Sequence, residues 1–236
     1  LSGGLDGVGA YDGHHDVFNN VVYNWGGRAT DGGSHEVNFV NNYYKMGPAT
    51  TQKKLFRLQL EGTGSGTHSA YVHGNIRQAA GNGALTEDKL KDTYVYETSN
   101  GQVVNWEPFV SKPFFESLAA IESAKAAYKN VLCDVGANQP FLDNHDTRMV
   151  NETLAGTTTT VGSQSGKKGL IDSEEDKGCE GFKGLNITEA KRDANWDTDQ
   201  DGMPDWWEEV KGVSDGNADE NADGYTNLEE YLNWLA

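Results

Sequence analysis

Two scarcities restrict what this chain can be. It has only 2 cysteines among 236 residues, so at most one internal disulfide is available, and the sequence leaves open whether Cys133 and Cys179 form it. It also lacks any apolar run near the roughly 20 residues that cross a bilayer as a helix, so no membrane span is predicted. The length suffices for one sizeable domain and a small appendage.

Basic residues are also scarce, and their balance with acidic residues is uneven. The chain has 19 Lys and Arg against 36 Asp and Glu, a net charge of -17. Residues 172–236 hold 19 acidic and 5 basic residues, a net of -14, which leaves -3 for residues 1–171. Because nucleic acid binding needs clustered Lys and Arg, we expect no nucleic acid partner. The acidic tail is either solvated or neutralised by cations.

Short strands are predicted in the first part of the chain, where the 29 glycines also indicate frequent turns. Three runs rich in β-branched and aromatic residues, 17–23, 37–44 and 71–76, are typical of strands. The first two contain Asn-Asn pairs that lie 22 residues apart. This spacing favours a solenoid of stacked β-coils, in which Asn side chains satisfy backbone groups of neighbouring turns. An antiparallel meander is the alternative.

Two helices are predicted after the strands. Apolar residues at helical spacing predict a helix between Glu116 and Cys133, with Gly136 as its stop, and a second helix over 143–154. Residues 156–185 have the Gly-, Thr-, Ser- and Lys-rich composition of an irregular crossing segment. The predicted domains are therefore β-coils over 1–112, helices and crossing segment over 113–190, and an acidic tail over 191–236.

Two segments of the tail match the twelve-residue EF-hand calcium loop. That loop places oxygen ligands at positions 1, 3, 5, 7, 9 and 12 and a glycine at position 6. Residues 197–208 fit with Gly202 at position 6, and residues 219–230 fit with Gly224 there. The expected ligands are Asp197, Asp199, Asp201, the Met203 carbonyl, Asp205 and Glu208 in the first loop, and Asp219, Asn221, Asp223, the Tyr225 carbonyl, Asn227 and Glu230 in the second.

The ligand set consists only of oxygen atoms, which favours Ca²⁺ over zinc or copper. A short helix is expected after each loop, with aromatic residues such as Trp206, Trp207 and Trp234 available to pack. We therefore predict a compact structural pair and not a sensor. Extracellular modules of this kind bind Ca²⁺ with a Kd of about 10⁻⁴ to 10⁻³ M. Such sites fill outside cells, so we expect a secreted, periplasmic or cell-surface protein.

The strand region resembles a known enzyme family. Residues 16–26, Asp-Val-Phe-Asn-Asn-Val-Val-Tyr-Asn-Trp-Gly, and residues 40–50, Val-Asn-Asn-Tyr-Tyr-Lys-Met-Gly-Pro-Ala-Thr, resemble the late coils of pectate lyases of polysaccharide lyase family one, especially a Bacteroidetes-type subgroup. Residues 71–75 look like the next coil, 143–150 are similar to the subgroup's motif after the helix, and the calcium tail looks like its ending. The resemblance covers most of the chain in patches.

The resemblance implies both a fold and a reaction. The fold is a right-handed parallel β-helix with short helices and an EF-hand-like calcium tail. The reaction is β-elimination on polygalacturonate, a pectic polysaccharide. In it an active-site Ca²⁺ bridges enzyme and substrate carboxylates and makes the proton at C5 more acidic. An arginine removes that proton, and the C4–O bond breaks to leave an unsaturated uronide.

The family's base lies in an Arg-x-Pro-Arg stretch before the first strand block, and no such stretch occurs in these 236 residues. We therefore expect the catalytic base on an N-terminal portion of the same protein, and we assign no catalytic residue here. Arg28 and Lys45, near the coil edges that would border the cleft, are candidate substrate contacts. A solvated surface charge is the alternative for each. His14, His15 and His35 are expected in loops near the same face.

Two other functions are open. A β-helix pectin hydrolase of the polygalacturonase type needs paired carboxylates as acid and base. The strand region offers Asp12, Asp16, Asp31 and Glu36, but no tight Asp-Asp cluster. A non-catalytic, calcium-dependent glycan-binding or docking module would explain the two loops, although such modules are far shorter than this chain.

Overall fold

The computed structural model describes residues 4–60, 64–87, 90–98, 103–138, 142–173, 176, 192–193 and 195–235. The chain forms two compact units. Unit 1 comprises Leu1–Gly136 and Asp143–Gly184, and unit 2 comprises Ala137–Leu142 and Leu185–Ala236. Cys133 is exposed, and Cys179 lies outside the described residues, so the possible bridge stays untested.

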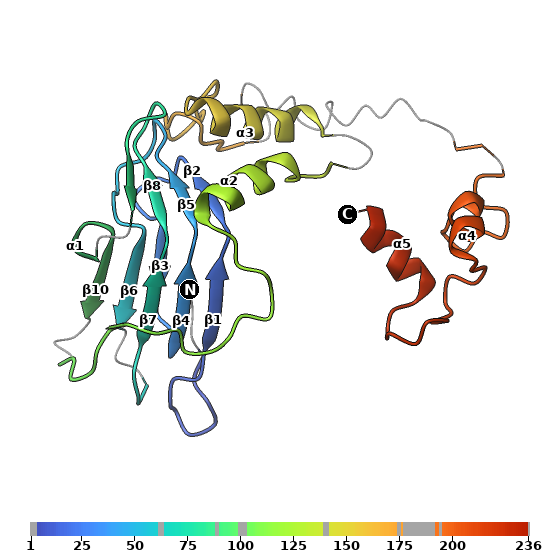
Figure 1. The fold of residues 1–236 in the computed structure, drawn as a ribbon. Helices are drawn as coiled ribbons and strands as arrows, with labels where there is room; N and C mark the ends of the chain where they lie inside the picture. The colour runs from blue at the N-terminus through green and yellow to red at the C-terminus, as the bar shows by residue number, and fades with distance from the viewer. Residues whose placement is uncertain are drawn as a thin grey trace. The chain divides into compact units, whose positions relative to one another are not determined.

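Unit 1 is mainly β and contains three sheets (Figure 1). The first sheet has the order β1 (His14–Phe18), β4 (Glu36–Val40), β7 (Ser69–His73) and β11 (Phe109–Val110). The second has the order β2 (Val21–Tyr23), β5 (Tyr43–Lys45), β8 (Ile76–Gln78) and β9 (Leu85–Glu87). The third has the order β10 (Tyr94–Thr98), β6 (Phe56–Leu60) and β3 (Thr30–Gly32).

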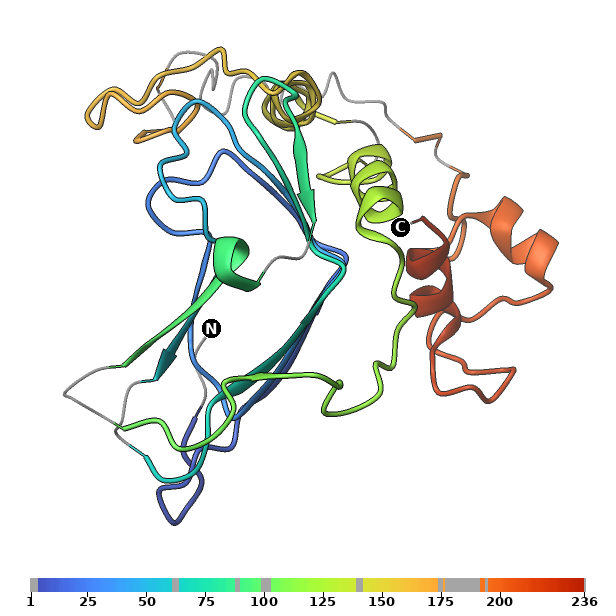
Figure 2. The same cartoon turned by 60° about the vertical axis from the view of Figure 1, so that its left-hand side comes forward.

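The chain passes through the three sheets in a repeating order. Strands β1, β2 and β3 make one turn, β4, β5 and β6 make the next, and each strand pairs in parallel with its counterpart one turn later. In Figure 2 the strands of one sheet lie almost behind one another, as stacked turns require. Only the β8–β9 pair is antiparallel among the described strands. The stacked coils predicted from the asparagine spacing are therefore present, and the antiparallel meander is wrong.

Three asparagines, of which Asn42 and Asn75 are buried, connect successive turns between the first and second sheets. The Asn20 Nδ2 donates to Asn42 Oδ1 at 2.9 Å, and the Asn42 Nδ2 donates to Asn75 Oδ1 at 2.9 Å. The same two oxygens accept the backbone N–H groups of Asn20 and Asn42 at 3.1 and 2.9 Å. These bonds confirm that stacked Asn side chains satisfy turn backbone groups, which would be costly to bury unpaired.

Asn20, Asn42 and Asn75 form a ladder of asparagines, and the residue before each of them turns the chain from the first sheet to the second. Asn19, Asn41 and Gly74 have φ values of 55°, 54° and 68°. This left-handed conformation favours asparagine and glycine over other residues. Because of these turns, each of the three runs predicted as one strand is two strands.

The core of unit 1 lies inside the stacked turns. It contains Val37, Phe39, Tyr44, Leu55, Phe56, Leu58 and Leu60, all at most 1% exposed. The Phe39 and Phe56 rings stack with their centroids 5.1 Å apart. Burial of one such side chain stabilises the fold by about 1.5–3 kcal/mol.

Among the described residues of unit 1 there are three helices: α1 (Leu90–Thr93), α2 (Ala124–Cys133) and α3 (Asn144–Ala155). Both α2 and α3 were predicted, but α2 begins eight residues after Glu116. The Ser123 side chain accepts a hydrogen bond from the Ala126 N–H and caps α2 there, while Leu118 is fully exposed. Helix α2 packs on β2 and β5, where the Tyr43 and Tyr128 rings lie 4.4 Å apart.

The described part of unit 2 includes two short helices, α4 (Asp205–Lys211) and α5 (Asn227–Leu235). Met203, Trp207 and Tyr231 form its buried core. The Trp206 and Trp234 rings contact each other at 5.6 Å but stay about half exposed. No helix among the described residues is long and apolar enough to cross a bilayer.

Candidate functional site

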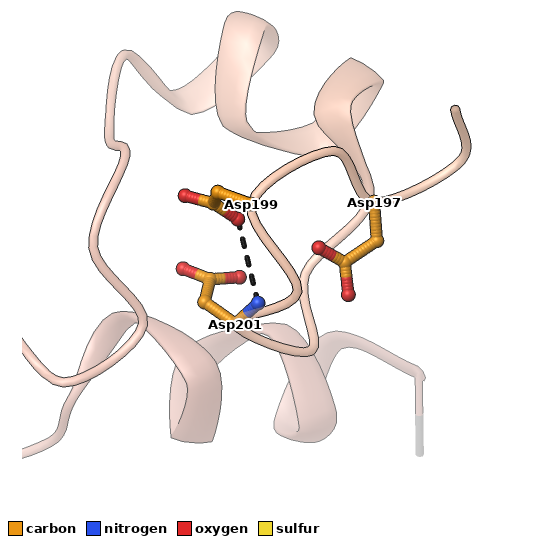
Figure 3. Close-up of side chains that lie close together, drawn as sticks. All are labelled: Asp197, Asp199 and Asp201. Carbon is orange, nitrogen blue, oxygen red and sulfur yellow. Dashed lines mark hydrogen bonds between the residues drawn. The ribbon is translucent and has the colours of Figure 1, made fainter. Parts of the chain in front are cut away.

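Three carboxylates converge in the first acidic loop. One oxygen each from Asp197, Asp199 and Asp201 lies within 4.8 Å of the others (Figure 3). The backbone curls around them, because the Gln200 and Gly202 N–H groups both donate to the Asp197 carboxylate, at 2.7 and 3.0 Å. Gln200 and Gly202 have φ values of 64° and 99°. The glycine at position 6 therefore makes the sharp turn that the loop needs.

Glu208, at position 12, lies in the electric field of these aspartates. Partial burial raises the pKa of the Glu208 carboxyl, and the charges of Asp199 and Asp201 raise it further. Like charges held together favour protonation or a bound cation. Asp205 points elsewhere, because its carboxylate accepts hydrogen bonds from the Thr198 N–H and hydroxyl at 2.7 and 2.6 Å.

In the second loop, hydrogen bonds involve the side chains at positions 1, 3, 5 and 12. The Gly224 N–H donates to the Asp219 carboxylate at 3.0 Å. The Asn221 Nδ2 donates to the Asp223 and Glu230 carboxylates at 3.1 and 2.6 Å. Asn227 at position 9 is buried, and its side chain donates to the Asp215 carbonyl at 2.8 Å. The two position-9 side chains, of Asp205 and Asn227, thus form hydrogen bonds with Thr198 and Asp215. Convergence of ligand atoms within the described residues is found for Asp197, Asp199 and Asp201.

One backbone hydrogen bond closes each loop in the same way. The Asp205 N–H donates to the Trp196 carbonyl at 3.0 Å, and the Asn227 N–H donates to the Ala218 carbonyl at 2.8 Å. Each bond joins position 9 to the residue just before position 1. Unit 2 is therefore a repeat of a loop followed by a helix. Converging carboxylates, positive φ at the glycine and oxygen donors throughout fit Ca²⁺ better than a softer metal.

The two predicted substrate contacts lie in different environments. Lys45, in β5, is 1% exposed. Its ammonium donates to the Tyr128 hydroxyl at 3.1 Å and to the Leu154 carbonyl at 3.0 Å, and burial lowers the pKa of this group. The ammonium thus anchors both α2 and α3 to the sheet.

Arg28 belongs to a row of alternating charges on the outer face of the third sheet. Its side chain is 78% exposed, and its Nε lies 3.6 Å from Asp31 Oδ2. Asp31 pairs in register with Arg57 on β6, whose guanidinium lies 3.3 Å from Asp31 and 2.6 Å from Glu97. The hydrogen bond that the Arg57 guanidinium donates to the Glu97 carboxylate raises the pKa of Arg57.

Sequence reasoning missed Arg57 and Glu97. Residues 56–60, Phe-Arg-Leu-Gln-Leu, alternate between buried and partly exposed positions. This period of two was the signal for a strand with Arg57 on its outer face.

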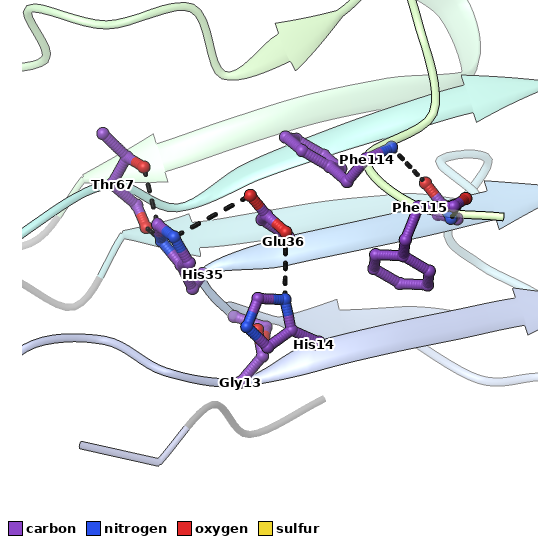
Figure 4. A network of polar contacts seen from close by, with 9 residues as sticks. Gly13, His14, His35, Glu36, Thr67, Phe114 and Phe115 are labelled. Atoms are coloured by element: carbon purple, nitrogen blue, oxygen red, sulfur yellow. Dashed lines mark hydrogen bonds and ion pairs between the residues drawn. The ribbon is translucent and has the colours of Figure 1, made fainter. Parts of the chain in front are cut away.

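His14 and His15 begin β1, so the prediction that they lie in loops is wrong, whereas His35 lies in the connection just before β4. His14 Nδ1 lies 2.9 Å from one oxygen of Glu36, and His35 Nε2 lies 3.9 Å from the other (Figure 4). The other nitrogen of His35 lies 2.9 Å from the Thr67 carbonyl. The register of β1 with β4 places His14 beside Glu36 and fixes this network.

The chain was compared with known proteins. It is 30% identical over 233 residues to a protein named "Probable pectate lyase C" from Aspergillus flavus, and the aligned region covers 94% of this chain and 49% of that protein. The chain is similar in sequence to pectate lyases. Proteins of the same name from Aspergillus oryzae and Aspergillus fumigatus are 30% and 29% identical, with the same coverage. The chain spans about half the length of the curated relatives it matches. No model of a known protein family matches.

Proposed function

We propose that this chain is the C-terminal portion of a secreted, calcium-dependent pectate lyase that cleaves polygalacturonate by β-elimination. The single observation that carries the proposal is similarity over 94% of the chain to proteins named as pectate lyases. The three parallel sheets, visited in a repeating order, support the finer proposal that unit 1 is part of a right-handed parallel β-helix.

In this proposal unit 2 holds Ca²⁺ and unit 1 contributes to substrate binding. Asp197, Asp199, Asp201 and Glu208 would hold one ion, and the corresponding residues of the second loop another. Bound Ca²⁺ neutralises carboxylates that otherwise repel one another, so its role in this unit is structural. Because four carboxylates of the first loop and three of the second would surround an ion, this unit is the part of the chain that depends most on the ion.

Arg28 is the proposed substrate contact in unit 1. Its guanidinium is the most exposed group of the charged row, and a planar guanidinium matches a uronate carboxylate with two parallel hydrogen bonds. The base that removes the C5 proton, and the Ca²⁺ that acidifies it, are assigned to the N-terminal portion of the same protein.

Full-length protein incubated with polygalacturonate tests this proposal. We expect ultraviolet absorbance to rise as unsaturated product forms, and the rise to stop when a chelator is added. Arg28→Gln should raise KM several-fold with little change in kcat, since a lost rim contact weakens substrate binding uniformly. Lys129→Gln, an exposed cation on α2, which packs on the second sheet, is the matched control. Saturated products with new reducing ends would instead indicate a hydrolase, and binding without turnover would indicate a glycan-binding module.

A further inference from the structure

Two hollows on unit 1 meet at His73. One, of about 450 Å³, is lined by the turn after β7 and the start of α2, including Asn41, Glu87 and Lys125. The other, of about 400 Å³, is lined by Tyr71 on β7, Phe109 on β11 and Ser111. His73 lines both, so the two hollows adjoin at the end of β7, and together they are called the groove here. Figure 1 shows β7 and α2, the elements that border it. The groove is distinct from the charged row around Arg28, which lies on the third sheet.

An aromatic platform forms one side of this groove. Tyr71 and His73 are two residues apart on β7, so their side chains leave the same face of the sheet. Their ring planes are 14° from parallel, and the ring centroids are 6.0 Å apart. Neither side chain makes a hydrogen bond to another described residue. Aromatic rings with a free polar edge suit a ligand that has an apolar face and hydroxyl groups, such as a pyranose ring.

The first hollow is also lined by Lys125, whose ammonium forms an exposed ion pair. The Lys125 ammonium lies 3.5 Å from the Glu87 carboxylate, and the two side chains are 60% and 68% exposed. Exposed pairs of this kind contribute little free energy, so an incoming carboxylate can replace Glu87 at small cost. Lys125 also lies in the first turn of α2, which contains no acidic residue. The positive end of the helix therefore adds to the attraction for an anion.

We propose that this groove binds an acidic oligosaccharide, with pyranose rings on Tyr71 and His73 and a uronate carboxylate on Lys125. The choice of a uronate rests on the proposed function. The groove is then a second glycan contact, which would hold the polymer on a face other than the one that carries Arg28.

Titration of this chain with a galacturonic acid trimer tests the groove by calorimetry and by NMR of the aromatic residues. A chelator is present throughout, so that the calcium loops cannot contribute. We expect Tyr71 and His73 resonances to shift. Lys125→Gln should weaken binding about fivefold, and Glu87→Gln should strengthen it two- to threefold, because each changes one surface ion pair. Lys129→Gln, on the exposed face of the same helix, should change affinity by less than twofold.

The opposite effects of Lys125→Gln and Glu87→Gln separate a binding role from a folding role, since a fold defect would weaken binding in both. Equal affinity for a neutral galactose trimer, equal loss in Lys125→Gln and Lys129→Gln, or no shift of Tyr71 and His73 would each overturn the proposal. The result of this titration does not decide the proposed function. A full-length protein without lyase activity can still bind the trimer here, and an active one can fail to.

Discussion

Removal of calcium should unfold unit 2 well before unit 1. Each loop holds several carboxylates, and in the first loop burial and the charges of Asp199 and Asp201 raise the pKa of Glu208. An ion bound only to the folded state stabilises it by RT ln(1 + [L]/Kd), which is about 1.4 kcal/mol at tenfold and about 2.7 kcal/mol at a hundredfold excess over Kd. Two loops together therefore contribute roughly 3–5 kcal/mol, which is most of the stability of a unit this small.

Tryptophan fluorescence during thermal unfolding is the assay. Trp196, Trp206, Trp207 and Trp234 all belong to unit 2, so they dominate the signal from the chain's 6 tryptophans. A chelator should lower the unit 2 melting temperature by more than about 10 °C, since 1 kcal/mol shifts Tm by about 4–8 °C in a domain of this size.

Paired variants at neighbouring positions identify the loop as the cause. Glu208→Gln should raise the Kd for Ca²⁺ at least about tenfold, which is 1.4 kcal/mol. Glu209→Gln removes the same charge from the next residue, which is exposed, and should leave the Kd within about twofold. An unchanged melting temperature in chelator, or equal effects of the two substitutions, would refute the assignment of these loops as calcium sites.

Three further predictions concern unit 1. Asn42→Ala removes the side-chain hydrogen bonds that link neighbouring coils and should cost about 2–4 kcal/mol in urea unfolding; a loss below about 0.5 kcal/mol would contradict a structural ladder. Gly74→Ala places a Cβ against the Asn41 amide at positive φ, and it should destabilise the protein by at least about 1 kcal/mol more than Gly81→Ala, where φ is also positive but the space is open. Burial lowers the pKa of Lys45 below 10.5. Between the lowered pKa of the folded protein and 10.5, the unfolded chain binds more protons than the folded one, so the contribution of Lys45 to stability rises with pH. Lys45→Met should therefore flatten the increase in unfolding free energy as pH approaches 10.5, and an unchanged slope would show that the ammonium is not desolvated.

The repeating coils were predictable because their turn chemistry is local. The pairs Asn19-Asn20 and Asn41-Asn42 indicate a left-handed turn followed by a side chain that hydrogen-bonds to the next coil, and each pair consists of two consecutive residues. Strand β6 was missed although it alternates cleanly. Strands β3, β10 and β11 are shorter or lack a strong pattern, and they are specified by pairing with residues far away in sequence. The start of α2 was predicted too early because apolar spacing continues past Ser123, and only the cap decides where the helix begins.

The candidate sites show the same division between local and distant information. The acidic loops place their ligands within twelve residues, so the sequence predicted the convergence of Asp197, Asp199 and Asp201. The burial of Lys45 depends on α2 and α3, which follow it by more than 80 residues. The Asp31–Arg57–Glu97 row needs the register of three strands, and no local pattern contains that register.

The mass of the first product from polygalacturonate tests the proposed reaction most directly. β-Elimination forms a C4–C5 double bond without adding water, whereas hydrolysis adds one water molecule across the broken bond. Full-length protein with Ca²⁺ should release oligogalacturonides lighter by one water than the corresponding hydrolysis products, and none when a chelator is present. Products with the mass of hydrolysed fragments, or no cleavage at all, would contradict the assignment as a pectate lyase.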